Sequence, residues 1–144
     1  MNDKALHLLG LARRGRRLEV GEEPVGSICR AGRARLVLIA GDASDHTLRR
    51  AQSFCRSGKP PYLKVAFTKE ELGGALGFGQ CALCAFTDPA MALAFMQTLA
   101  PEAQDEAIIA ELTRQTARVK KRRQEEKAHR NNVKHGKYSQ EVAV

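Results

Sequence analysis

The sequence predicts an α/β fold, with a mostly parallel or mixed β-sheet that helices cover on both faces. Three short apolar stretches have the composition of strands, each bounded by Gly, Pro or Asp: LVLIA at residues 36–40, YLKVAF at 62–67 and CALCAF at 81–86. Between them, apolar residues recur three and four positions apart, as in amphipathic helices. Because alternating strands and helices build a covered sheet, we expect one compact domain over residues 1–100.

The first thirty residues predict two helices around a short strand. Residues 3–13 place small and apolar side chains on one helix face, and the basic stretch around Gly15 ends that helix. A strand over residues 17–20 should follow, and Gly21 begins the second helix. Its first turn holds two carboxylates, which suit the positive end of the helix dipole, and a proline, which a first turn accepts. These residues are Glu22, Glu23 and Pro24.

The middle of the chain predicts two more helices with side-chain caps. Asp42 or Ser44 caps the first, and two prolines after it force an extended entry into the next strand. Thr68 caps a short helix over residues 69–75, with Glu71 as the third residue of a capping box. Four glycines then predict a tight, exposed loop: Gly73, Gly74, Gly77 and Gly79.

The chain after residue 100 predicts a basic helical extension, residues 101–144. Just before it, Asp88 and Pro89 begin the last helix of the compact domain. The extension should hold one helix from about residue 102 to about residue 130, followed by a disordered end. Its apolar stripe is thin, so the sequence leaves open whether the helix packs on the domain or projects from it. The stripe consists of Ile108, Ile109, Leu112 and Val119.

The balance of charge predicts a polyanionic partner. The chain of 144 residues carries 24 Lys and Arg against 16 Asp and Glu, a net charge of +8, and its isoelectric point is about 9.7. The excess lies in two basic regions, one within residues 1–58 and one within 117–137. No apolar run reaches the roughly 18 residues that span a bilayer, and the first residues lack the features of a signal peptide. We therefore expect a cytoplasmic protein with no membrane partner.

Residue types that carry catalysis or bind metals are too scattered to form a recognisable site. Cys81 and Cys84 have the spacing of half a zinc site, but no second pair is usably spaced, and strand alternation predicts opposite directions for their side chains. The glycine loop lacks the lysine and hydroxyl of a phosphate-binding P-loop. The four cysteines are expected as free, buried thiols and the four histidines at the surface. The sequence therefore predicts no enzyme, cofactor, metal or small-molecule substrate.

Three features offer contacts to nucleic acid, and each also has a purely structural interpretation. Phe78, at the tip of the glycine loop, either stacks on an extruded base or folds into the core. Glu22 and Glu23 either accept hydrogen bonds from base edges or only stabilise the start of the second helix. The KKRR run at residues 120–123 either attracts phosphates without sequence preference or forms a solvated helix face.

Four segments carry a resemblance to a known family: HLLGLARRGRRLEVGEEPV, RARLVLIAGDASDHTLRR, KEELGGALG and AFTDPAMA. Read together, over about residues 8–99, they resemble the ribosomal-protein L7Ae family, and within it the small bacterial YlxQ-type branch. The resemblance implies a three-layer α/β/α sandwich with a four-stranded mixed sheet and no catalytic activity. Many members bind the kink-turn, an RNA bend built on tandem sheared G·A pairs.

The resemblance also implies which residues meet RNA. In kink-turn binders the second helix begins with Gly-x-Asn-Glu-x-x-Lys, and a loop before the last strand packs on an extruded nucleotide. Here Gly21 keeps the glycine, while Glu23, Pro24 and Ser27 replace the three polar residues. The resemblance therefore leaves two targets, a kink-turn or another structured RNA. The implied RNA-binding residues are Arg13, Arg14, Arg16, Arg17, Gly21, Glu22, Glu23, Arg33, Phe78, Gly79 and Gln80.

We therefore expect a non-catalytic protein that binds structured RNA, kink-turn-like or ribosomal, and works at the ribosome. Four residues of the extension would add nonspecific affinity for RNA. They are Lys120, Lys121, Arg122 and Arg123. The alternative is a protein–protein interaction module whose basic tail alone touches RNA. The sequence leaves the oligomeric state open.

Overall fold

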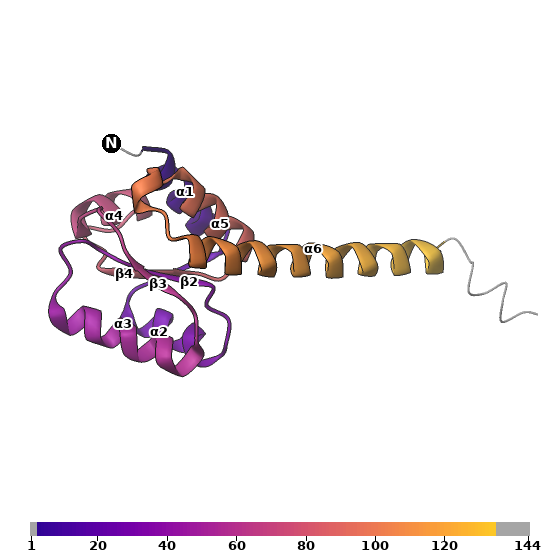
Figure 1. Ribbon diagram of the computed structural model, residues 1–144, viewed down its shortest axis with the longest axis horizontal. Coiled ribbons are helices and arrows are strands. Elements are labelled where there is room, and N and C mark those ends of the chain that lie inside the picture. Colours follow the sequence, from indigo (N-terminus) through magenta and orange to yellow (C-terminus); the bar gives the residue numbers. More distant parts are fainter. Residues whose placement is uncertain (1–2, 135–144) are drawn as a thin grey trace, which may run out of the picture.

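The computed structural model describes residues 3–134, in which a four-stranded mixed sheet lies between layers of helices (Figure 1). The strands are β1 (Leu18–Val20), β2 (Leu36–Ile39), β3 (Tyr62–Lys64) and β4 (Leu83–Phe86), in the spatial order β1-β4-β2-β3. β4 is antiparallel to both of its neighbours, whereas β2 and β3 are parallel. The predicted α/β class and the mixed sheet are confirmed.

Helices cover both faces of the sheet, and the last helix leaves the domain (Figure 1). One face is covered by α2 (Glu22–Arg30) and α3 (Asp45–Gly58), and the other by α1 (Asp3–Arg14), α4 (Lys69–Leu76) and α5 (Pro89–Thr98). A 3-10 turn, Pro101–Ala103, leads to α6 (Glu106–Lys134), which starts beside α5 and then projects. The three-layer sandwich implied by the resemblance is confirmed.

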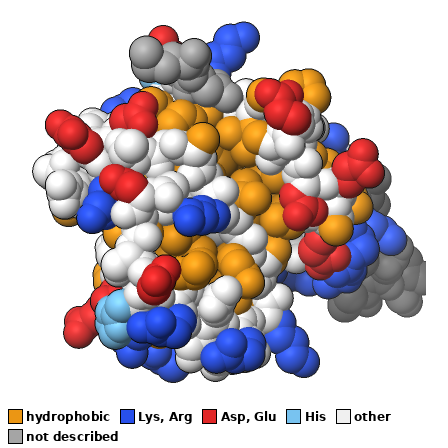
Figure 2. All heavy atoms as spheres, turned by 60° about the vertical axis from the view of Figure 1, so that its left-hand side comes forward, with side chains coloured by type: hydrophobic (Ala, Val, Ile, Leu, Met, Phe, Trp, Pro, Cys, Tyr) orange, Lys and Arg blue, Asp and Glu red, His pale blue; other side chains and the backbone are white. Residues whose placement is uncertain are grey.

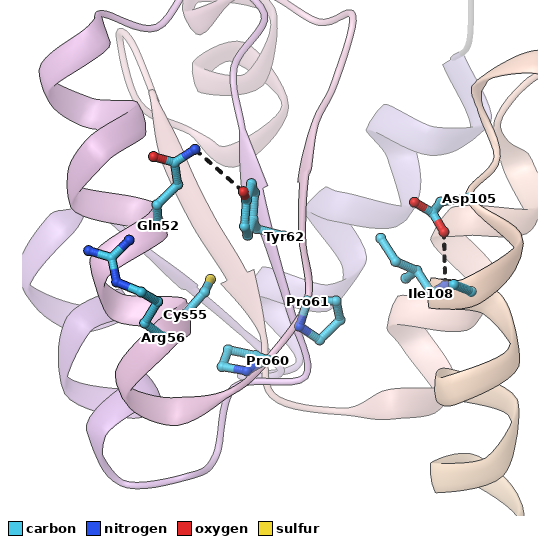
Figure 3. A pocket seen from close by; sticks show the side chains of 9 residues that line it. Gln52, Cys55, Arg56, Pro60, Pro61, Tyr62, Asp105 and Ile108 are labelled. Atoms are coloured by element: carbon cyan, nitrogen blue, oxygen red, sulfur yellow. Dashed lines mark hydrogen bonds between the residues drawn. The ribbon is translucent and has the colours of Figure 1, made fainter.

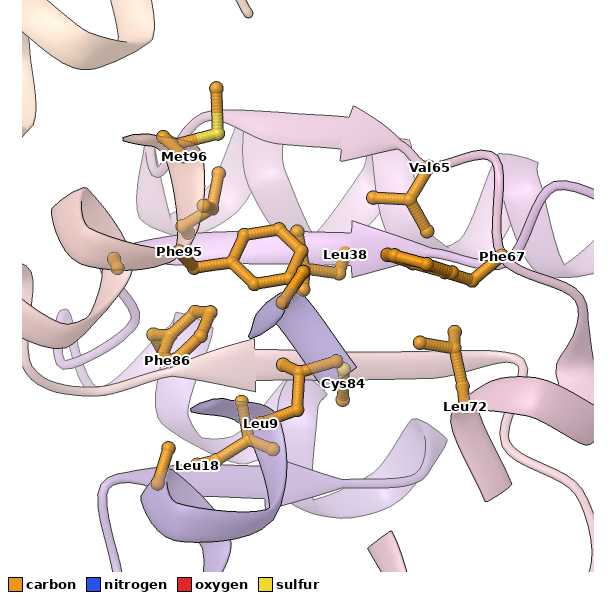
Figure 4. Packing of buried hydrophobic residues seen from close by; sticks show 14 of the residues in the cluster. Leu9, Leu18, Leu38, Val65, Phe67, Leu72, Cys84, Phe86, Phe95 and Met96 are labelled. Atoms are coloured by element: carbon orange, nitrogen blue, oxygen red, sulfur yellow. The ribbon is translucent and has the colours of Figure 1, made fainter. Parts of the chain in front are cut away.

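Each face of the sheet has its own hydrophobic core, because β2 and β4 are buried on both sides. Every second side chain of β2 and β4 packs toward α1, α4 and α5. In this core Phe86 contacts Phe95, with ring centroids 5.6 Å apart (Figure 4). The intervening side chains, on the opposite face of β2 and β4, pack toward α2 and α3. The first set comprises Leu36, Leu38, Cys84 and Phe86, and the second Val37, Ile39, Leu83 and Ala85.

Side-chain caps fix where the central helices begin. The Ser44 hydroxyl accepts a hydrogen bond at the start of α3, so it is the cap of the two that were predicted. Thr68 and Glu71 form both hydrogen bonds of the predicted capping box, at 3.1 and 3.0 Å. Asp42 does not cap α3. Its carboxylate accepts the N–H of Lys69 at 2.8 Å and so ties the end of β2 to the start of α4.

All four predicted strands are longer than the observed ones, β1 and β2 by one residue each, and the predicted helix over residues 69–75 extends one residue further. β3 ends at Lys64 rather than at residue 67, because its partner β2 ends at Ile39. β4 begins at Leu83 rather than at residue 81. Gly73 and Gly74 belong to α4, since the capping box starts a helix that runs through them. The chain leaves the helix only at Gly77, with a left-handed φ of 81°.

The first turns of α6 are part of the core, and the rest of the helix is exposed. The helix begins later than predicted, where the Asp105 carboxylate accepts the N–H of Ile108 at 3.1 Å. Ile108 and Leu112 join the core beneath α5, whereas residues 120–131 are exposed. The sequence left open whether this helix packs on the domain or projects from it. In the structure its first turns pack on the domain and the rest projects. The predicted disordered end lies outside the described residues, and within residues 3–134 no helix has the length and apolar character to cross a membrane.

The open edge of the sheet at β3 carries a cavity of about 520 Å³ (Figure 3). Its walls come from α3, β3 and the start of α6, and the Gln52 amide donates a hydrogen bond to the Tyr62 hydroxyl at 3.4 Å. Pro60 and Pro61 precede the strand, and prolines have no N–H with which to pair another strand. None of the sequence-predicted site residues lines this cavity.

Candidate nucleic-acid interface

α2 begins after a glycine whose backbone conformation is unfavourable for other residues. Gly21 follows β1 with φ of 101° and ψ of 162°, a region that is essentially restricted to glycine. Its N–H donates to the carbonyl of Leu83 at 2.9 Å, which holds the start of α2 against the start of β4. No side chain caps α2, so no capping group occupies the N–H groups of its first turn.

A pocket of about 260 Å³ joins three segments that are far apart in the sequence. They are the junction of β1 and α2, the start of α3, and the loop from α4 to β4. Gly21, Glu22, Phe78 and Gln80 line this pocket, so the structure brings four sequence-predicted residues together. Gly79 lies between the last two and is exposed. Thr47 of α3 also lines the pocket, and no sequence motif marked this residue.

The loop that carries Phe78 is held tightly on α4. The N–H of Phe78 donates to the carbonyl of Gly73 at 2.8 Å, and the N–H of Cys81 donates to the carbonyl of Lys69 at 2.9 Å. A Cβ atom on Gly73 would lie only 2.7 Å from the Cα atom of Gln80. The loop backbone therefore packs directly on the helix, with no space for a side chain between them.

Phe78 lies at the surface, so the interpretation in which it folds into the core is wrong. The residue is 43% exposed, and the guanidinium of Arg13 lies 4.5 Å from the centre of its ring. Such a cation–π contact holds an aromatic ring in place without burying it. The ring is therefore positioned beside the pocket and accessible to a ligand.

Glu22 is paired with a cation that the sequence did not mark. Its carboxylate lies 3.0 Å from Nε of Arg50 on α3, and the same guanidinium lies 5.1 Å from the centre of the Phe54 ring. The pair is about half exposed, so it contributes little to stability. It does neutralise one negative charge beside the pocket. Within the described residues no ion pair engages Glu23, which is exposed in a cavity of about 540 Å³ that Ser27 also lines.

Of the predicted arginines of the first region, only Arg13 contacts a residue that lines the pocket. Arg13 contacts Phe78 at the pocket, and Arg14 lines a cavity between α1 and α4. Arg16 and Arg17 precede β1, whereas Gly21 follows it. Arg16 and Arg17 are held on the last turn of α1, where their N–H groups donate to the carbonyls of Arg13 at 3.0 Å and Ala12 at 2.8 Å. Neither of them lines the pocket.

Arg33 is distant from the pocket. It follows the C-terminal end of α2, whereas the pocket lies at the N-terminal end of that helix. The projecting part of α6 carries the exposed KKRR run and leaves on the side opposite α4 (Figure 1). Figure 2, which brings the α4 side forward, shows hydrophobic side chains in the middle of that face, basic ones along its lower edge and acidic ones above and to the right. The face is thus mixed rather than uniformly basic.

Arg16 has a left-handed backbone, with φ of 60°, in the turn that ends α1. An L residue in this conformation costs about 1–2 kcal/mol, and glycine does not. Arg16→Gly is therefore expected to raise the free energy of unfolding by about 0.5–1 kcal/mol, after the greater freedom of glycine in the unfolded chain is allowed for. Urea denaturation measures the free energy of unfolding. Arg16→Ala is the control, because alanine in the same left-handed conformation keeps the backbone strain. If Arg16→Gly were less stable than Arg16→Ala, the conclusion that the backbone of residue 16 is strained would be wrong.

Cys81 and Cys84 point into the same core, which corrects the prediction of opposite directions. Cys81 precedes β4, so the alternation of a strand does not apply to it. Hydrogen bonding between the two thiols lowers the pKa of Cys81 and, together with burial, raises the pKa of Cys84. Burial raises the pKa of Cys55 to about 12. All four cysteines are free and buried, as predicted.

Within residues 3–134, residues that could bind a metal ion do not cluster. No three His, Cys, Asp or Glu side chains of this range lie where they could hold a metal ion. His7, His46 and His129 are exposed, as predicted, and His135 lies outside the described residues.

Comparisons with known proteins identify a protein family and related structures. The profile of the ribosomal protein L7Ae/L30e/S12e/Gadd45 family matches residues 3–95. The chain is 39% identical over 85 residues to the RNA-binding protein YlxQ of Bacillus subtilis (strain 168), which covers 59% of this chain and 84% of that protein. A solved protein of unknown function from Bacillus halodurans C has a TM-score of 0.60 and 32% identity, over 66% of this chain and 95% of that one. The Giardia lamblia 15.5kD RNA binding protein shares the fold, with a TM-score of 0.50 and 18% identity over 78% and 83% of the two chains.

Proposed function

Because the chain belongs to the ribosomal protein L7Ae/L30e/S12e/Gadd45 family, we propose that it binds structured RNA at the pocket between the start of α2 and the loop before β4. The observation that carries this proposal is the meeting of Gly21, Glu22, Phe78 and Gln80 around that pocket. The two segments that implied RNA contacts by resemblance thus lie side by side. The protein is non-catalytic and acts by holding RNA, and we place it at the ribosome in the cytoplasm.

Each residue of the pocket offers a different contact to RNA. The exposed ring of Phe78 suits stacking with an unstacked base, and Arg13 adds a positive charge beside it. Gly21 lacks a side chain, so a phosphate or base edge can approach the first turn of α2. The Gln80 amide both donates and accepts hydrogen bonds, as base edges require. Together these contacts fit a folded RNA with one base turned outward.

We infer that sheared G·A pairs are not the feature that this protein reads. Glu23, Pro24 and Ser27 stand where the kink-turn binders have Asn, Glu and Lys. An ionised Glu23 can only accept hydrogen bonds, Pro24 has no polar side chain, and Ser27 carries no charge. A ribosomal RNA hairpin or internal loop with an unstacked base is therefore the target class that we propose.

The full-length protein can be titrated against a kink-turn RNA and against a matched RNA that keeps the bulge but lacks the G·A pairs. We expect salt-dependent binding of both, with affinities within about threefold of each other. A strong preference for the kink-turn would show that Glu23, Pro24 and Ser27 are tolerated in the ancestral mode. The absence of binding to either RNA would contradict the proposal.

Phe78→Ala is expected to weaken binding of these RNAs about tenfold, because base–aromatic stacking contributes about 1–3 kcal/mol. Leu11→Ala is a matched control, since Leu11 is also 43% exposed but does not line the pocket. Fluorescence anisotropy with labelled RNA measures both variants. Equal affinities for the two would remove Phe78 from the interface.

The alternative is a protein-binding domain whose basic tail alone touches RNA. It predicts no effect of Phe78→Ala and a complete loss of RNA binding when residues 120–123 are neutralised. Neutralisation in the full-length protein is a cleaner test than deletion of residues 101–144, because that deletion would also remove Ile108 and Leu112 from the core.

A further inference from the structure

A groove of about 390 Å³ between α5 and α6 lies outside the pocket described above. One wall is the first turn of α5 with the residue before it, and the other is the middle of α6. Pro89 and Ala90 on the first wall and Val119 on the second give the groove apolar lining. Thr116 and Gln124 add a hydroxyl and an amide from α6. The groove thus combines apolar surface with hydrogen-bonding groups.

Cations line the α6 side of this groove, and its single acid is engaged elsewhere. Lys120, Arg123 and Lys127 line it, and within residues 3–134 no ion pair occupies any of them. Asp88 is the acid, and its carboxylate accepts the N–H of Met91 at 3.0 Å as the cap of α5. The groove therefore has an unneutralised excess of positive charge.

The three cations form a row on one face of α6. At about 1.5 Å rise per residue, Lys120 and Arg123 are about 4.5 Å apart along the helix axis, and Lys127 follows after about 6 Å. Each residue also turns the helix by about 100°, so Lys121 and Arg122 point to other sides. The KKRR run is thus not one uniform patch, since only Lys120 and Arg123 of its four residues line the groove.

We propose that this groove is a second RNA-binding site, which takes a single-stranded segment. Phosphates would lie along Lys120, Arg123 and Lys127, and the faces of riboses and bases would lie on the apolar lining. Single-stranded RNA alternates charge with flat apolar surface, and the groove presents both. The inference rests on the proposed function only in taking RNA as the ligand. The pocket lies beside α4 and the groove along α6, so one molecule would hold two RNA segments (Figure 1).

The test uses full-length variants and a labelled 12-nucleotide oligouridylate. The groove variant carries Lys120→Gln, Arg123→Gln and Lys127→Gln. The control carries Arg118→Gln, Lys121→Gln and Arg122→Gln, and removes the same charge from the opposite face of α6. The sequence predicted RNA contacts for Lys121 and Arg122 as well, but neither lines the groove, so this inference excludes both from the binding residues. We expect the groove variant to bind about tenfold more weakly, with a salt slope lower by about 2, because each phosphate contact on a single strand contributes about 0.7. We expect the control to change affinity by less than about threefold.

A second variant fills the groove without changing its charge. Ala90 is exposed in the first turn of α5, so Ala90→Trp should fold and block the groove, which thermal unfolding checks. A loss similar to that of the charge variant is expected. Equal losses in the two charge variants, or unchanged binding in Ala90→Trp, would overturn the inference in favour of nonspecific attraction. The groove variant is also tested with a 12-residue oligoglutamate. If this variant loses binding to oligoglutamate but keeps binding to oligouridylate, the result overturns the inference in favour of an acidic protein partner.

Failure of this inference and failure of the proposed function have different signatures. If only the pocket binds RNA, Phe78→Ala weakens binding of the structured RNAs while the groove variants leave oligouridylate binding unchanged. If only the groove binds RNA, Phe78→Ala has no effect, and the groove variants lose oligouridylate as expected.

Discussion

Leu112→Ala is expected to lower the free energy of unfolding by about 3 kcal/mol. Leu112 is fully buried in the core beneath α5, although the sequence places it in a polar segment after the compact domain. Removal of its isobutyl group leaves a cavity that neighbours fill only in part, and the cost combines lost burial with that cavity. Urea denaturation followed by circular dichroism measures the change.

Lys121→Ala is the control on the same helix. Lys121 is exposed on the projecting part of α6, so its replacement should change the free energy of unfolding by less than about 0.5 kcal/mol. A cost below about 1 kcal/mol for Leu112→Ala would mean that α6 is not docked. The expected result instead extends the folding unit past residue 100, and we propose that the domain boundary lies within α6.

Gly73→Ala and Gly74→Ala are expected to have opposite effects, although the two glycines are neighbours on α4. A Cβ atom on Gly73 would lie 2.7 Å from the Cα atom of Gln80, and backbone at that distance must move. We expect a loss of about 2 kcal/mol in the free energy of unfolding. Since the displaced loop carries Phe78, we also expect RNA affinity to fall about tenfold, as when its stacking contact is lost.

Gly74→Ala is the matched control. A Cβ atom there meets nothing within 4 Å, and alanine favours a helix more than glycine by about 0.5–1 kcal/mol. The variant should gain stability by about that amount and bind RNA unchanged. A Gly73→Ala protein that is destabilised but binds RNA normally would show that the loop position does not matter to the interface.

Local signals in the sequence were sufficient to predict where several helices begin. The capping box of Thr68 and Glu71, the start of α5 at Asp88 and the start of α2 at Gly21 depend on residues within one turn of each other. Strand lengths depend on partners instead. β3 stops at Lys64 because β2 stops, and no property of residues 65–67 reveals this.

The interface was predictable in outline and not in its contacts. Resemblance identified the start of α2 and the loop at Phe78, and the structure places both at one pocket. Arg50 was missed because it reaches Glu22 from a helix 28 residues later in the chain. That Arg13 alone of the first four arginines contacts Phe78 was missed for a similar reason, since charge along the sequence does not show which side chain reaches the loop.

The angular phase of α6 decides which side chains face α5. Leu112 anchors the helix, and eight residues later Lys120 reaches the groove. One residue inserted between them would rotate the distal helix by about 100° and turn Lys120, Arg123 and Lys127 away from α5. For the proposed groove site, the number of residues between Leu112 and Lys120 therefore matters as much as the identity of the three cations, even where the intervening side chains point into solvent.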